Sequence, residues 1–229
     1  MKEQLLRAID EGRSLEAELN GLVVDQPANP DGTWTAKDHL AHLAWWRRQS
    51  AKTIDAVRTG VVLPPLAGED DVQNAIIYAE VKDLPASSVM ADARESWDAL
   101  RKAVEESSDE VLAKPHPRFD DSQVWETVPG AVGHTATHVW TALLEAGDEK
   151  RAIEVARWGA ELEGRFFSTA EKLADSRYNL ACVYARVGRT EEALALLRES
   201  FIAKPEQVEW ARKDHDFDGI REELAPLLM

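Results

Sequence analysis

Three histidines have the residue type and the spacing to bind one metal ion. His134 and His138 lie four residues apart, and four residues advance the side-chain direction of an α-helix by about 400°. The two imidazoles are therefore expected on one helix face, one turn apart, where both can reach a single divalent ion. His42, in another segment, is a candidate third ligand. Three protein ligands with an open position are typical of catalytic metal sites, whereas structural sites are usually closed by four.

The elements that must carry these histidines are predicted to be helices. Apolar residues recur at helical spacing along the chain, and no stretch alternates long enough to suggest a sheet. The first helix is expected at 2–22, followed by a turn-rich connector at 25–32. The second begins at a capping box, with Thr35 as N-cap and Asp38 three residues on, and runs to about Arg58.

The following helices are predicted from the same periodicity. An acidic loop at 69–71 leads into a short helix at 72–80, and a longer helix follows Pro85. The segment 107–130 holds three prolines and is expected to be a long ordered loop or a hairpin-like excursion. The helix that carries the histidine pair is expected to begin after this segment and to end at Gly147, a candidate C-cap.

The C-terminal part contains an internal sequence similarity. Segments 146–153 and 187–194 are similar, and the run 178–197 resembles a tetratricopeptide repeat. Their offset is 41 residues, which is longer than that family's usual period of about 34, so the loop around Gly164 is expected to carry an insertion.

Charge and composition exclude several classes of partner. A formal net charge of -15 argues against nucleic acid and against an anionic membrane surface, since both require a basic footprint. The single cysteine, Cys182, excludes an internal disulfide and is compatible with a reducing compartment. No apolar stretch has the length of a signal peptide core or a membrane span, so a cytoplasmic protein is expected.

The motif around the first histidine resembles a known family. The run 34–43 is similar to the helix-two signature of the DinB-like four-helix bundle superfamily, in which a tryptophan precedes an aspartate and a histidine follows four residues after it. Asp38 and His42 fit this pattern. The segment 74–78, with the helix through Trp97, is similar to the ClbS/DfsB branch of that superfamily.

This resemblance implies a metal site but leaves its register open. His42, His134 and His138 match the ligands that hold a divalent transition metal in metal-containing members, with zinc or nickel expected here. Sequences of the ClbS/DfsB type allow a second alignment, in which His138 takes the first histidine position and Ala142 stands at the second.

The expected architecture is all-α: a DinB-like four-helix bundle at 1–146, followed by a tetratricopeptide-like extension at 147–229. The resemblance implies an enzyme that hydrolyses a small electrophile, or transfers a low-molecular-weight thiol to it, for detoxification or self-resistance. The alternatives are a non-catalytic adaptor, whose repeat region binds a protein partner or forms a homodimer, and a protein that sequesters a small molecule.

Several further residues are candidates for the site. By resemblance, Asn74 and Tyr78 are polar site groups; among the tryptophans, Trp46, Trp125 and Trp140 are candidate pocket walls, with core packing as the other interpretation.

The remaining chemically active side chains receive structural interpretations. His39 precedes His42 by three residues, so one interpretation places it on the same helix face, toward the cleft; the preferred one is that it donates to a carboxylate, either behind a metal ligand or at the surface. Asp38 is interpreted as a capping residue, and Arg47 and Arg48 as solvated charges. Cys182 lies on the apolar side of a repeat helix and is interpreted as core filler.

Overall fold

A computed structural model of the chain describes residues 1–26, 29, 33–68 and 70–229. Over this part of the chain every regular element is a helix, which confirms the all-α prediction. No helix among the described residues is long and apolar enough to cross a membrane. Most of the predicted connector at 25–32, and Glu69 of the predicted acidic loop, lie outside the described residues.

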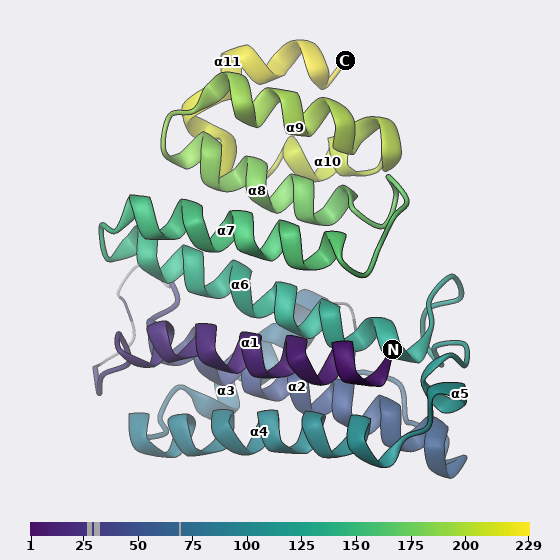
Figure 1. Cartoon of the computed structure of the whole chain (residues 1–229). Helices are drawn as coiled ribbons and strands as arrows, with labels where there is room; N and C mark the ends of the chain where they lie inside the picture. Colours follow the sequence, from purple (N-terminus) through teal and green to yellow (C-terminus); the bar gives the residue numbers. More distant parts are fainter. Residues whose placement is uncertain (27–28, 30–32, 69) are drawn as a thin grey trace. The chain divides into compact units, whose positions relative to one another are not determined.

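The chain divides into two compact units, Met1–His138 and Val139–Met229. The first unit is built from long helices that run side by side (Figure 1). Its elements are α1 (Lys2–Asn20), α2 (Ala36–Thr59), α3 (Asp70–Val81), α4 (Ala86–Glu106), α5 (Asp109–Leu112), the 3₁₀ turn η1 (Val124–Glu126) and the greater part of α6 (Thr127–Glu145), which continues into the second unit.

The capping box predicted at the start of α2 is confirmed. The Thr35 hydroxyl accepts a hydrogen bond from the Asp38 backbone N–H, and the Asp38 carboxylate accepts one from the Thr35 backbone N–H at 2.9 Å. These two bonds satisfy backbone donors that have no partner inside the helix. Gly60, in the left-handed region at φ 75°, ends the helix. Because the start of α2 is fixed locally, the direction in which His42 projects is fixed as well.

The core of the first unit lies where α1, α2, α4 and α6 meet. At Gly12 of α1, an added Cβ would come within 2.8 Å of the Trp97 ring on α4 and 3.0 Å of Val132 on α6. Both neighbours are buried, so glycine is the residue that lets these three helices approach one another.

The start of α6 differs from the prediction. The helix begins at Thr127, not after residue 130, because Pro129 falls in its first turn, where a missing N–H costs no helical hydrogen bond. The preceding segment is shorter than expected and partly helical. It contains α5 and η1, and its hairpin-like part is reduced to a single antiparallel bridge between Pro115 and Gln123.

The second unit consists of α7 (Glu149–Gly164), α8 (Ala174–Arg186), α9 (Thr190–Ala203), α10 (Gln207–Ala211), the 3₁₀ turns η2 (His215–Ile220) and η3 (Ala225–Leu227), and α11 (Arg221–Leu224), after the last residues of α6. The two similar segments, 146–153 and 187–194, also have similar local structures. Gly147 and Gly188 both adopt positive φ, at 84° and 74°, and each ends a helix immediately before the next. The following residues close the same turn: Asp148 N–H donates to Leu143 and Arg189 N–H to Tyr184.

Candidate metal centre

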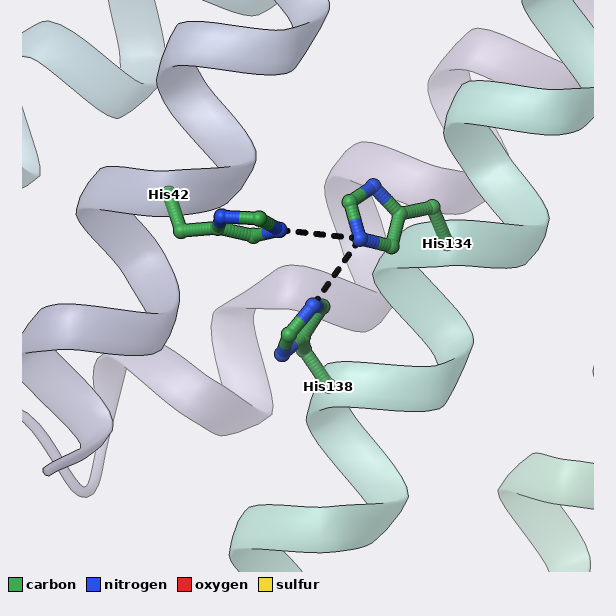
Figure 2. Close-up of side chains that lie close together, drawn as sticks. All are labelled: His42, His134 and His138. Carbon is green, nitrogen blue, oxygen red and sulfur yellow. Dashed lines mark hydrogen bonds between the residues drawn. The ribbon is translucent and has the colours of Figure 1, made fainter. Parts of the chain in front are cut away.

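The structure brings His42, His134 and His138 together inside the first unit. Figure 2 shows the rings of His134 and His138 projecting from α6 toward His42 on α2. The Nε2 atom of His134 lies 3.0 Å from Nε2 of His42 and 2.9 Å from Nε2 of His138. These three side chains, which form the histidine cluster, each offer one nitrogen within 4.8 Å of the others.

The chemistry of this donor set fits a divalent cation. A neutral imidazole nitrogen offers either one N–H or one lone pair, so Nε2 of His134 cannot make two good hydrogen bonds to its two neighbours. Three imidazole nitrogens within 4.8 Å of one another can instead share one metal ion through their lone pairs. Tetrahedral zinc with Zn–N bonds of about 2.0–2.1 Å places its nitrogens roughly 3.3 Å apart. Contacts of 2.9 and 3.0 Å therefore need only small side-chain adjustments to accommodate the ion.

Burial keeps these imidazoles neutral. His42 is 4% exposed, and desolvation, with the neighbouring histidines, lowers its pKa to about 3. Desolvation likewise lowers the pKa of His134 to about 4, and it lowers that of His138 well below the ordinary value. At neutral pH each ring therefore carries a lone pair. His134 and His138 are half-buried as whole residues, whereas His42 is buried.

The alignment in which His134 and His138 are both ligands agrees with this geometry. Ala142, the second histidine position of the other alignment, is 4% exposed and has only a methyl group. It has no atom that can bind a metal, whereas His134 contacts both of its partners.

His39 differs from its prediction. It is 6% exposed, so it is not a surface residue, and its hydrogen-bond partner is an imidazole instead of a carboxylate. Its Nδ1 atom lies 2.7 Å from Nδ1 of His138. Burial lowers the pKa of His39 to about 4, so this ring is neutral as well. Asp38, next to it, serves as the predicted capping residue.

Trp34 is a neighbour of the cluster that the sequence analysis did not assign to the site. Its ring centroid lies 4.8 Å from that of His42 and 6.1 Å from that of His138, nearly parallel to the latter. It is half-buried and directly precedes the N-cap Thr35. Its position in the same sequence motif as His42 could have identified it as a neighbour of the site.

A buried ion pair lies beside the cluster and corrects the prediction that Arg47 is solvated. Arg47 is 1% exposed and is paired with Glu16 of α1, which also accepts a hydrogen bond from the Trp97 indole at 2.9 Å. Arg47 further contacts Ser96 at 2.9 Å and Thr135 at 3.4 Å. Its charge contributes to the lowered pKa of His134. Arg48, by contrast, is half-buried and pairs with Asp92 near the surface.

The polar site candidates on α3 are linked to α2. The Trp46 indole N–H donates to the Asn74 side-chain oxygen at 3.3 Å, and the Trp46 ring lies 6.3 Å from that of His42. Asn74 and Tyr78 are both half-buried and one helical turn apart, so they share a face of α3.

The two other tryptophan candidates lie elsewhere. Trp125 is half-buried on η1, and its indole N–H donates to Gln123 at 2.6 Å. Trp140 belongs to the second unit, where it is 3% exposed beneath the Arg186 guanidinium. A role in a pocket stays a prediction for both.

Fold and site together define a class: a helical bundle with a three-histidine cluster between two of its helices. A family model described as the DinB superfamily matches residues 3–146, which is more than half of the chain. The chain therefore belongs to the DinB superfamily. No curated protein and no solved structure matches it.

Proposed function

We propose that this protein is a metal-dependent enzyme of the ClbS/DfsB type, with a tetratricopeptide-like extension, that hydrolyses a small electrophile or transfers a low-molecular-weight thiol to it. The observation that carries the proposal is the convergence of three neutral imidazole nitrogens from α2 and α6 within 4.8 Å. His42, His134 and His138 would hold a divalent transition metal, zinc or nickel. Such an ion supplies Lewis-acid chemistry, lowering the pKa of a water or thiol toward neutrality.

The chain's own residues have separate tasks in this proposal. The three histidines bind as neutral ligands, which their lowered pKa values favour at pH 7. Trp34 covers one side of the cluster with an apolar surface and restricts water there.

Polar groups for orienting the substrate are proposed on α3. Because the Trp46 indole engages the oxygen of Asn74, the amide group is oriented with its NH₂ as the donor for a substrate. The Tyr78 hydroxyl on the same helix face is a second hydrogen-bonding group.

Turnover of a reactive electrophile tests the proposal. Zinc- or nickel-loaded protein is incubated with an epoxide and with a Michael acceptor, with and without a low-molecular-weight thiol. Mass spectrometry then detects the addition of one water or one thiol. We expect conversion by the loaded protein, and loss of conversion in the metal-stripped protein and in His42→Ala, with His215→Ala as the control. Stoichiometric binding without conversion would contradict catalysis and favour sequestration.

A further inference from the structure

The two ring nitrogens of His138 face two different partners. Nε2 lies 2.9 Å from His134 in the cluster, and Nδ1 lies 2.7 Å from Nδ1 of His39. At 2.7 Å, one of the two Nδ1 atoms carries the proton and the other supplies the lone pair. The choice matters because a neutral imidazole holds one proton. If it is on Nδ1 of His138, then Nε2 has a free lone pair; if not, Nε2 carries the proton.

We infer that His39 is a positioning residue, which accepts a hydrogen bond from Nδ1–H of His138 and so keeps the Nε2 lone pair of His138 directed into the cluster. This inference rests on the proposed metal site and assigns it a specific outer partner. Metal-bound histidines are generally oriented in this way by a group that accepts their other N–H.

The geometry argues against His39 as a fourth ligand. Its contact is with the far nitrogen of His138, on the opposite side of that ring from His134. His39 is also outside the set of residues whose ligand atoms converge.

The reverse proton arrangement does not suit the cluster. If His39 donated the proton, Nε2 of His138 would carry its own N–H toward His134 and could not bind an ion. Nε2 of His39 is buried without a partner among the described residues in either arrangement, so the nitrogen facing the cluster decides between them.

The ring of His39 is held in a place where it can act in this way. It is 6% exposed, and its centroid lies 5.5 Å from that of Trp34, edge to face, and 4.9 Å from that of His138. The first turn of α2 also fixes its backbone, since His39 N–H donates to the Thr35 carbonyl at 3.0 Å. A buried ring between two aromatic neighbours has few other rotamers open to it.

The test compares two substitutions that differ in one acceptor atom. His39→Asn keeps an oxygen acceptor near the position of the imidazole Nδ1, whereas His39→Leu keeps the volume without any acceptor. His215→Leu is the control, because the His215 side chain is 93% exposed and lies in the other unit. Zinc affinity is measured by competition with a chromophoric chelator, and thermal unfolding of the metal-free proteins reports whether each variant is folded.

We expect His39→Leu to bind zinc about 10- to 100-fold more weakly than wild type, the range found when such outer partners are removed. His39→Asn and His215→Leu are expected to bind as wild type does. Equal affinity in the folded His39→Leu protein would overturn the inference. So would an asparagine variant as weak as the leucine variant, because the acceptor would then be irrelevant.

A second readout separates this inference from the proposed function. In metal-free wild-type protein, ¹⁵N NMR of the imidazole nitrogens is expected to show His138 with its proton on Nδ1. A proton on Nε2 overturns the inference even if zinc binds. If the wild-type protein binds neither zinc nor nickel, the proposed function fails, and the NMR result still decides the role of His39.

Discussion

Each unit of the protein contains three metal-ligand side chains within 4.8 Å of one another: the histidine cluster in the first unit, and Cys182, Asp214 and Asp216 in the second. Proximity alone therefore does not distinguish them. In the second group the polar atoms are already engaged. Asp214 accepts from the Tyr178 hydroxyl at 2.9 Å and from the Asp216 backbone N–H at 3.0 Å, and Asp216 lies 3.6 Å from Arg186.

The protonation states of the two groups differ as well. Burial lowers the pKa of His42 and so leaves a lone pair at neutral pH. Burial and the adjacent Asp214 carboxylate raise the pKa of Cys182 well above its ordinary value, which keeps it a thiol. A thiolate is required to bind a metal, so burial favours ligation by the histidines and opposes it at the cysteine. A group of potential ligands is therefore a better candidate site when its protonation state at neutral pH leaves lone pairs for a metal.

The largest predicted effect is a loss of zinc affinity when a ligand of the histidine cluster is removed, with no loss when Cys182 of the second group is replaced. His138→Ala is expected to weaken zinc binding by more than the about 100-fold that loss of an outer partner can cost, because it removes one of three direct ligands. Cys182→Ser is expected to leave the affinity unchanged. Calorimetric titration of both proteins checks this, and a loss of affinity in Cys182→Ser with none in His138→Ala would show that the wrong group has been assigned.

The buried ion pair beside the cluster gives the next effect. Arg47→Leu leaves Glu16 as an uncompensated buried charge, so we expect a loss of about 3–5 kcal/mol in the free energy of unfolding. In the second unit, Arg189→Leu removes an exposed pair with Glu192 and a cation–π contact with Tyr184, and is expected to cost no more than about 1 kcal/mol. Denaturant unfolding followed by tryptophan fluorescence measures both. A small effect of Arg47→Leu would show that the pair is solvated after all.

Acidification should affect the two units in opposite directions. Folded His39, His42 and His134 titrate near 3–4, whereas the unfolded residues titrate near about 6.5. Between these values the unfolded state binds more protons, so the metal-free first unit loses stability as the pH falls. Each histidine contributes about 1.4 kcal/mol per pH unit in that range.

In the second unit, buried carboxyl groups have raised pKa values, and their effect on stability is opposite to that of the histidines. Burial raises the pKa of Glu163 to about 7 and also raises that of Asp216, so the folded state binds more protons than the unfolded state below pH 7. This unit should therefore gain stability from these groups as the pH falls from 7 toward 5. Hydrogen exchange with mass spectrometry at pH 7 and pH 5 resolves the units, once corrected for the intrinsic exchange rate. A parallel loss of protection in both would be inconsistent with the assigned shifts.

A smaller effect is predicted within the second group of ligands. Tyr178→Phe removes the hydrogen bond to Asp214 and is expected to cost about 1.5–3 kcal/mol of stability, the usual range for a bond to a charged group. Zinc affinity should be the same as in wild type. A change in metal content with no change in thermal stability would instead point to metal binding in the second unit.

The smallest effect tests the packing that supports the cluster. Gly12→Ala inserts a methyl group against Trp97 and Val132, so overpacking of about 1–3 kcal/mol is partly offset by the better helix propensity of alanine, worth about 1 kcal/mol. We expect a net loss of about 1 kcal/mol by thermal unfolding. Gly164→Ala, at a position with open space around it, is the control and should not be destabilising.

Local signals predicted much of the fold and the grouping of the three histidines. The capping box at Thr35 and Asp38 and the adjacency of the His134 and His138 rings each depend on only a few neighbouring residues. Both were predicted from the sequence. The start of α6 was predicted too late, because Pro129 marks a loop and a first helical turn equally well.

Features that depend on contacts between helices far apart in the sequence could not be predicted from local sequence patterns. Arg47 is buried because Glu16, 31 residues earlier, lies opposite it, and neither residue has an unusual local context. His39 contacts a residue 99 positions away. Its three-residue spacing from His42 placed it near the same helix face, but only the packing of α2 against α6 determines its partner.

X-ray absorption spectroscopy of the zinc-loaded protein distinguishes the two groups of ligands by element, because only the second group contains sulfur. If the ion is held by His42, His134 and His138, the spectrum will show three imidazole nitrogens at about 2.0–2.1 Å and a remaining light-atom ligand. A sulfur neighbour at about 2.3 Å, which only Cys182 or a methionine can supply, or a shell without imidazole scattering, would contradict the account.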